Sequence, residues 1–275
     1  MSSSPIISLL DALSKLVPGR SRSDLRKLLA DERVLLNGQS VKIARMPVAP
    51  DDVVTIATPQ RADAVPPFPI VYVDDDLLVI DKPPGLITSS TPTERRPTAL
   101  AIARAWAAAE RPRAKVGLVH RLDADAAGLL AFSLNNAAHA VLKRQFADHS
   151  AGRTYEAFVR PPVTPPAGTI RSRLVEHADG TVHRTRSAAH GQEAVTHYET
   201  VATESGLVKL RVALETGRKH QIRSHLSGRG WPIVGDQLYG GEPAARLMLT
   251  AVRLELVHPR TRQPVSFDLP TTGVR

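Results

Sequence analysis

Two carboxylates lie in a short polar segment between two apolar runs. Asp123 and Asp125 stand two positions apart in HRLDADAAGLL, which begins at His120. A carboxylate in such a segment can act as a nucleophile or as a base, and a pair of carboxylates can hydrolyse a glycosidic bond. Asp is also a good turn former, so these residues can equally cap a loop. The residue types alone leave all three interpretations open.

A second segment holds groups that bind phosphate or pair with a carboxylate. It reads LETGRKHQIRSHL over residues 214–226 and mixes Arg, Lys and His with apolar residues. His220 and His225 are five residues apart, which is not the i,i+4 spacing of a helical metal pair. The other histidines are widely spaced, so we expect no bound metal.

The chain as a whole carries excess positive charge. Lys plus Arg total 36 against 27 Asp plus Glu, a formal net charge of +9, and the sequence pI is about 10.2. This balance favours a polyanionic partner, most simply a nucleic acid. There is no cysteine, which excludes disulfides, thiolate nucleophiles and sulfur-ligated metals. No apolar run has the length of a membrane span and no secretory signal begins the chain, so we expect a cytoplasmic protein.

A strand-rich domain is predicted to position both polar segments. Helical patterns cover only residues 97–110, 137–147 and 219–227. Apolar and β-branched runs predict strands over residues 70–73, 77–82, 118–122, 128–134, 154–159, 194–201, 207–214, 246–256 and 265–269. This balance predicts an α+β domain over residues 70–275, with a mixed, largely antiparallel central sheet and flanking helices.

A small α/β module is predicted over residues 1–60, and a Pro-rich linker over residues 61–69 joins it to the larger domain. Apolar residues recur at helical spacing over 9–17 and 25–29. Asn37-Gly38 suits the positive φ angles of a tight hairpin turn. The predicted strands flank that turn and close the module: residues 34–36, 41–43 and 53–56.

The order of these elements, with RVLLNGQSV as hairpin and DDVVTI as last strand, resembles the alpha-L RNA-binding module. A small-subunit ribosomal protein and many RNA-modifying enzymes share that module. The resemblance implies that basic side chains of the second helix and its flanking loops grip the RNA backbone: Arg20, Arg22, Arg26, Lys27 and Arg33. The alternative is a solvated helix face, which is what most runs of charge are.

The larger domain resembles the RluA-type pseudouridine synthases in five sequence blocks. HRLDADAAGLL is similar to their signature HRLDxxTSGLL, and TGRKHQIRSHLSGRGWPIVGDQLYG is similar to their second signature. VYVDDDLLVIDKPPGL, GRTYEAFV and HPRTRQPVSFDLP match the opening strands, the tyrosine motif and the C-terminal strand. The five blocks follow the family order over residues 70–270. One such match could arise by chance, but five in order make another family improbable.

The resemblance implies an enzyme that isomerises uridine to pseudouridine in structured RNA and needs no cofactor. Asp123 would be its essential carboxylate, which attacks the sugar as a nucleophile or removes a sugar proton. Arg223 would pair with Asp123 in a bidentate manner and hold it ionised. Tyr155 would stack on the uracil ring and help to remove the proton from ring carbon five.

Three further residues would contact the substrate. Arg121 would reach the RNA and hold the target nucleotide out of its stack, and His220 and Ile222 would line the pocket. Members with this N-terminal module often act on large-subunit ribosomal RNA. The resemblance therefore favours ribosomal RNA over transfer RNA as the partner.

The chain departs from the family pattern beside the catalytic carboxylate. Ala126 and Ala127 replace the usual Thr-Ser, and Thr250 stands where the family usually has His. These changes leave open a catalytically degenerate RNA-binding protein of the same fold. A glycoside or nucleoside hydrolase that uses Asp123 and Asp125 is the alternative from another enzyme class.

Overall fold

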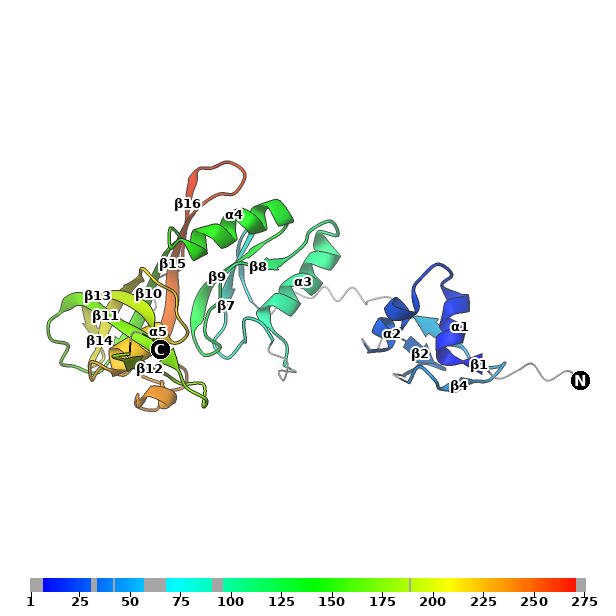
Figure 1. The fold of residues 1–275 in the computed structure, drawn as a ribbon, viewed down its shortest axis with the longest axis horizontal. Coiled ribbons are helices and arrows are strands. Elements are labelled where there is room, and N and C mark those ends of the chain that lie inside the picture. Colours follow the sequence, from blue (N-terminus) through cyan, green and yellow to red (C-terminus); the bar gives the residue numbers. More distant parts are fainter. Residues whose placement is uncertain are drawn as a thin grey trace, which may run out of the picture. The chain divides into compact units, whose positions relative to one another are not determined.

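The computed structural model describes residues 7–30, 34–41, 43–56, 68–90, 96–187 and 189–270. Contacts within the chain divide it into two compact units, Met1–Ala64 and Val65–Arg275 (Figure 1). Residues 61–67 of the predicted linker lie outside the described residues, as does Arg33. No helix in the described ranges is both long and apolar enough to cross a membrane.

The N-terminal unit packs two helices against short strands. Its helices are α1 (Leu9–Leu16) and α2 (Arg22–Ala30), and their buried leucines form the core, as the helical spacing predicted. The hydroxyl of Ser8 accepts the amide of Asp11 and so caps α1. Its short strands are β1 (Ile7–Ser8), β2 (Val34–Leu36), β3 (Gln39–Ser40), β4 (Pro47–Val48) and β5 (Val54–Ile56).

The second strand of the hairpin in this unit begins earlier than the sequence predicted. Asn37 and Gly38 have φ angles of 49° and 83°, so these two residues complete the whole turn. Pairing therefore resumes at once, with Leu36 opposite Gln39, and β3 begins there rather than at residue 41. The prediction placed the second strand two residues too late because it followed the apolar residues instead of the turn length.

The second unit is built on one sheet of eleven strands, in the order β12-β11-β13-β14-β10-β15-β9-β7-β6, with β16 beside β15 and β8 beside β9. The strands are β6 (Ile70–Val73), β7 (Leu77–Lys82), β8 (Gly117–Leu118), β9 (Ala127–Ser133), β10 (Gly152–Val159), β11 (Ala167–Glu176), β12 (Val182–Thr185), β13 (Gln192–Glu204), β14 (Leu207–Leu214), β15 (Leu249–Val257) and β16 (Pro264–Asp268). Described pairings are antiparallel, apart from β15 with β9.

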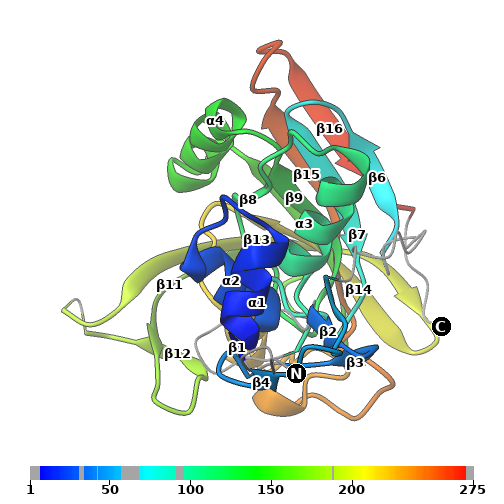
Figure 2. The same cartoon turned by 90° about the vertical axis from the view of Figure 1, so that its right-hand side faces the viewer.

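Both faces of the sheet are covered at β7 and β9. Leu78 and Leu130 belong to one apolar cluster, whereas their neighbours Leu77 and Leu129 belong to another. Helix α3 (Ala99–Glu110) packs on the first face and α4 (Asn136–Ala147) on the second (Figure 2). Strands buried on both sides need continuous apolar runs, which is why these two were readable from the sequence.

The strand predicted over residues 118–122 is much shorter in the structure. Only Gly117–Leu118 pairs with β9, and the chain stays outside the sheet until Ala127. Both backbone groups of Leu122 bond to the hydroxyl of Thr88 instead of to a neighbouring strand. The apolar residues of this segment are buried, but they belong to a loop that precedes β9.

Candidate active site

A cavity of 390 Å³ opens beside the loop that precedes β9. Its walls come from this loop, from the end of α4, from β10 and from the start of α5 (Gln221–Ser227). Asp123 is the one acidic side chain among the described lining residues. The basic and histidine side chains around it are His120, Arg121, Lys143, His149, Arg153, Arg218 and His220. Such a lining attracts a polyanion.

The loop that carries Asp123 is held on both sides of that residue. Thr88 donates its hydroxyl to the Leu122 carbonyl at 2.6 Å and accepts the Leu122 amide at 3.2 Å. The ammonium group of Lys82 donates to the Ala124 carbonyl at 2.8 Å. With its neighbours anchored, the Asp123 carboxylate, 24% exposed, is presented to the cavity.

Arg223 stands behind the cavity wall and faces Asp123 with one nitrogen. Its Nη1 lies 3.8 Å from Asp123 Oδ2, while its Nε and Nη2 donate to Asp236 at 2.8 and 2.7 Å. The bidentate pairing expected with Asp123 is therefore made with Asp236. The Asp236 side chain is wholly buried and needs a full counter-ion, whereas Asp123 retains solvent contact. The Tyr239 ring, 5.1 Å from Arg223 Cζ, packs against the guanidinium.

Tyr155 lines the cavity from β10 and is almost fully buried. Burial raises the pKa of its hydroxyl to about 12; nearby Arg153 opposes this shift and Asp123 adds to it. The hydroxyl therefore stays protonated at neutral pH. It can take up a proton from a substrate only if it passes its own proton on, and its ring forms part of the cavity wall.

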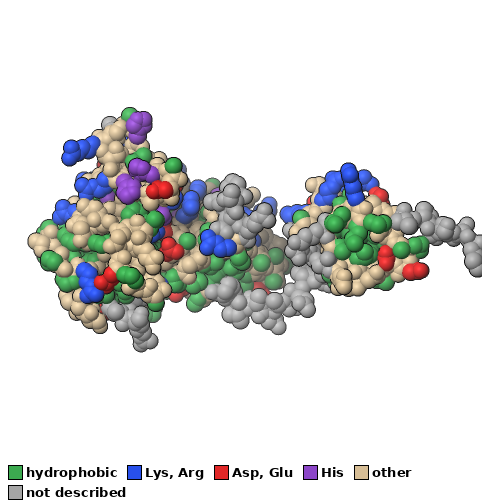
Figure 3. All heavy atoms as spheres, turned by 90° about the horizontal axis from the view of Figure 1, so that it is seen from below, with side chains coloured by type: hydrophobic (Ala, Val, Ile, Leu, Met, Phe, Trp, Pro, Cys, Tyr) green, Lys and Arg blue, Asp and Glu red, His purple; other side chains and the backbone are tan. Residues whose placement is uncertain are grey.

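The remaining predicted contact residues also reach this cavity. Arg121 is exposed at its edge and Ile222 is buried in its wall. His220 Nδ1 lies 3.0 Å from the Tyr239 hydroxyl, and burial lowers the pKa of its imidazole. The basic residues of the N-terminal unit lie exposed on α2 and just before it: Arg20, Arg22, Arg26 and Lys27. Figure 3 shows basic side chains gathered at one edge of that unit.

Comparison with known proteins gives the family. A family model described as "RNA pseudouridylate synthase" matches residues 76–228, and one described as "S4 domain" matches residues 8–54. The chain belongs to the RNA pseudouridine synthase family. The predicted α+β fold and the predicted reaction class, isomerisation of uridine in RNA, are thereby confirmed.

Related synthases cover most of the chain. Ribosomal large subunit pseudouridine synthase D of Pasteurella multocida is 34% identical over 284 residues, which span 94% of this chain and 86% of the relative. The protein of the same name from Yersinia pestis is 35% identical over 239 residues, spanning 84% and 72%. Human RNA pseudouridylate synthase domain containing 4 has a TM-score of 0.63 at 22% identity, covering 74% of this chain and 88% of its own, and so shares the fold.

Asp125 does not belong to the cavity of this synthase. Its side chain is 62% exposed and is absent from the described lining, although its Oδ2 lies 4.0 Å from Arg223 Nη1. A hydrolase with two carboxylates needs both of them at the scissile bond. The arrangement around Asp123 supports one reactive carboxylate, which argues against the hydrolase alternative.

Two departures from the family pattern are neighbours in the fold. Thr250 of β15 pairs with Ala127 of β9, where the family usually has His and Ser. Both changes therefore fall on the parallel strand pair directly after the Asp123 loop. Gly128 follows at a φ of 109°, and a Cβ there would lie 2.2 Å from the Ala251 carbonyl oxygen, so this close approach of strands requires glycine.

Four residues of the synthase site were missed as functional residues. Asp236 and Tyr239 clamp Arg223, and Lys82 and Thr88 anchor the Asp123 loop. Lys82 lies inside the matched block KPPGL, and Asp236 and Tyr239 lie inside GDQLYG. Their place in these blocks was the signal that could have marked them as functional. Nothing in the sequence marks Thr88, whose hydroxyl acts across 34 residues.

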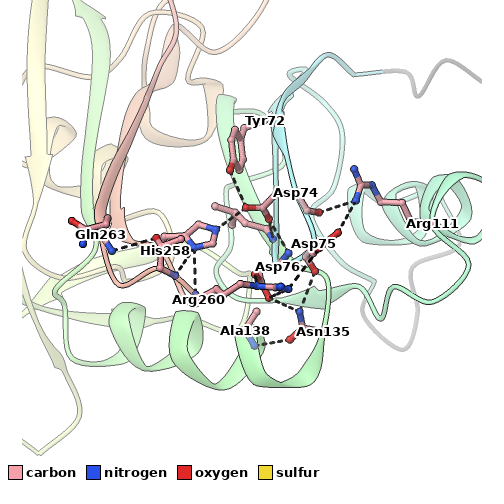
Figure 4. Close-up of polar contacts among 12 residues, drawn as sticks. Tyr72, Asp74, Asp75, Asp76, Arg111, Asn135, Ala138, His258, Arg260 and Gln263 are labelled. Carbon is pink, nitrogen blue, oxygen red and sulfur yellow. Dashed lines mark hydrogen bonds and ion pairs between the residues drawn. The ribbon is translucent and has the colours of Figure 1, made fainter.

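A separate polar cluster has residue types that could bind a metal (Figure 4). Asp74, Asp76 and His258 bring oxygen and nitrogen atoms within 4.8 Å of one another. His258 Nδ1 accepts the amides of Arg260 and Thr261, so its Nε2 carries the proton and donates to Asp74 at 2.7 Å. Arg260 Nε donates to Asp76 at 2.5 Å. With these partners the cluster acts as a clamp between the β6–β7 and β15–β16 turns.

Lys82 gives the synthase a pH-dependent stability. Burial lowers the pKa of its ammonium group to about 8 from 10.5, although Asp123 and Asp125 oppose the shift. Between these values the unfolded chain binds the additional proton, so stability rises with pH there. We compare the unfolding free energy of the wild type with that of Lys82→Met. The wild type minus variant difference should increase by about 3 kcal/mol between pH 8 and pH 10.5. Urea denaturation across this range measures it, and a constant difference would contradict it.

Proposed function

We propose that this synthase isomerises a uridine of large-subunit ribosomal RNA in the cytoplasm, with Asp123 as its catalytic carboxylate. The observation that carries the assignment is the position of Asp123. It is the acidic side chain among the described lining of a cavity that also carries arginine and lysine side chains, and its loop is anchored by Lys82 and Thr88. The names of the relatives from Pasteurella multocida and Yersinia pestis support the choice of RNA.

The chemistry assigns distinct work to three side chains. The bond from C1′ of the ribose to N1 of uracil breaks, and C1′ is joined to C5, which loses a proton while N1 gains one. The Asp123 carboxylate acts at the sugar, as a nucleophile or as a base. Tyr155 stacks on the ring and relays the C5 proton. Arg223, fixed by Asp236, orients Asp123 through Nη1. Atoms and electrons balance without a cofactor.

Pseudouridine mapping at single-nucleotide resolution tests this function. Total RNA from cells with and without the gene is compared, and we expect one or a few positions of large-subunit ribosomal RNA to lose the modification. Complementation with the wild type should restore them, and Asp123→Asn should not. A loss confined to transfer RNA would overturn the proposed target, and no loss in any RNA would support the degenerate relative.

Tyr155→Phe tests the proton relay separately from stacking. Phe keeps the aromatic face but removes the hydroxyl, so we expect RNA affinity within about twofold of the wild type. The single-turnover rate should fall about 100-fold, the scale of a lost proton transfer. Quench-flow of tritium release from C5 of the uridine measures the rate. An unchanged rate would confine Tyr155 to stacking.

We also propose that residues 1–60 act as an RNA-binding module through the basic side chains of α2 and its N-terminal flank. Arg22 is partly neutralised by Asp11 at 2.5 Å, so Arg20, Arg26 and Lys27 are the better phosphate ligands. Changing these three to Gln should reduce the slope of log affinity against log salt by about 2 to 3, because each contact releases condensed counterions. Fluorescence anisotropy between 50 and 200 mM salt, on the order of cellular ionic strength, measures it.

The matched control removes three exposed arginines that face carboxylates on the larger unit. Arg144, Arg160 and Arg211 pair with Asp148, Glu242 and Glu199, and none of the three lines the cavity. Their replacement by Gln changes the net charge of the protein by the same amount. Equal salt slopes for the two triple variants would show that total charge, and not α2, binds the RNA.

A further inference from the structure

The Arg153 guanidinium, in the wall of the cavity, makes no ion pair with an acidic side chain among the described residues. Arg153 lies on β10, two residues before Tyr155, and both side chains line the cavity. Its buried Nε has no hydrogen-bond partner in the described parts of the chain. Its Nη2 donates only a long bond of 3.5 Å to the Glu215 carbonyl, and its Cζ lies 5.9 Å from the centre of the Phe146 ring.

The charge of this guanidinium is poorly compensated within the described residues. Burial lowers the pKa of Arg153, and the group that opposes the shift is the Tyr155 hydroxyl rather than a carboxylate. Within the described ranges, no carboxylate acts on the pKa of Arg153 and its Nε has no hydrogen-bond partner. A half-buried cation in this condition costs stability unless an anion is supplied from outside.

The backbone is shaped to receive this side chain. A Cβ on Gly217 would lie 2.3 Å from Arg153 Nη1, so the absence of a side chain there makes room for the guanidinium. The Phe146 ring near this guanidinium is itself stacked on His120, with centroids 4.3 Å apart and planes 11° apart. The guanidinium therefore has both a glycine and an aromatic ring as neighbours.

We propose that Arg153, assisted by Lys143, binds a backbone phosphate of the RNA strand next to the target uridine; this rests on the proposed function. Arg153, Lys143 and the neighbouring Arg218 can only donate hydrogen bonds. Uracil presents an N–H beside its two carbonyl oxygens, and that N–H would find no acceptor among these three side chains, so a base is the poorer match. A phosphate accepts only, and the Arg fork fits two of its oxygens.

The test combines Arg153→Gln with single neutral linkages in the RNA. The probe is a stem-loop around the uridine that loses its modification in the mapping experiment. If that uridine is not in large-subunit ribosomal RNA, the proposed RNA target fails, but Arg153 can still be tested on the stem-loop that contains it. Asp123→Asn serves as background, so that binding is measured without turnover. We expect Arg153→Gln to weaken binding about tenfold and to reduce the salt slope by about 0.7 to 0.9, the value for one phosphate.

A methylphosphonate scan then locates the phosphate. With wild-type Arg153, one linkage beside the uridine should weaken binding about tenfold when neutralised, as loss of one charge-assisted contact does. With Arg153→Gln the same substitution should have no effect. The proposal would be overturned if the losses of affinity from Arg153→Gln and from the neutral linkage simply add at every position. It would also be overturned if Arg153→Gln left the salt slope unchanged.

Three controls separate binding from structure. Arg144→Gln removes an exposed cation of α4 that faces Asp148 outside the cavity, and its binding should match the wild type at every linkage. Arg153→Gln should melt no lower than the wild type, because it removes a poorly compensated buried charge. A lower melting temperature together with an unchanged linkage profile would mean that Arg153 only supports the fold. Arg153→Lys should keep the salt slope but lose part of the affinity.

Discussion

Asp123→Asn is expected to abolish uridine isomerisation while leaving the synthase folded and able to bind RNA. The amide keeps the size and shape of the carboxylate but has neither its charge nor its nucleophilicity. Loss of such a group lowers a single-turnover rate by about 10⁴-fold or more. The fold should tolerate the change, because Arg223 keeps its two bonds to Asp236 and the loop stays anchored through Leu122 and Ala124.

Asp125→Asn is the matched control for this experiment. Asp125 lies in the same loop and its Oδ2 is 4.0 Å from Arg223 Nη1, against 3.8 Å for Asp123. The two variants therefore remove the same charge at nearly the same distance from the same cation. Only Asp123 lines the cavity, so Asp125→Asn should stay within about twofold of the wild-type rate, as surface substitutions do. An active Asp123→Asn protein would refute the catalytic assignment.

Much of the fold could be predicted because the local sequence patterns agree with the burial of the side chains. The runs in β7 and β9 are apolar because both of their faces are covered, and β14 has the predicted bounds of residues 207–214. By contrast, β11 and β12 were not predicted. Most of their side chains are exposed or half-buried, so they lack a strong hydrophobic period. Strand β11 pairs with both β12 and β13, and these pairings leave no mark in a local sequence pattern.

In the candidate site too, some features could be predicted from the sequence and others could not. Asp123, Tyr155, His220 and Ile222 converge on one cavity, as the matched blocks implied. Arg223 does face Asp123, at 3.8 Å, but its bidentate bonds go to Asp236, because a sequence pattern names residues and not the depth at which they lie. Which of two nearby carboxylates receives the guanidinium fork depends on burial, and burial is set by packing across the whole unit.

The ion pair of Arg223 with Asp236 should therefore be the costliest polar pair to break. Arg223 is 4% exposed and the Asp236 side chain is not exposed at all. Asp236→Leu leaves the buried guanidinium without its two acceptors, and we expect a loss of about 3 to 5 kcal/mol of unfolding free energy. Asp268→Asn is the control: Asp268 pairs with Arg253 at 2.8 Å on the surface, and its loss should cost less than about 1 kcal/mol.

The double variant Arg223→Met with Asp236→Leu separates stability from catalysis. Removing both charges leaves no buried ion uncompensated, so most of the stability lost in Asp236→Leu should return. Activity should not return, because Asp123 then lacks the guanidinium whose Nη1 lies 3.8 Å from its carboxylate and orients it. Urea unfolding and single-turnover assays on the same preparations give both readouts. A double variant that is stable and active would show that Arg223 serves the fold alone, and one as unstable as Asp236→Leu would show that the pair is not the source of the cost.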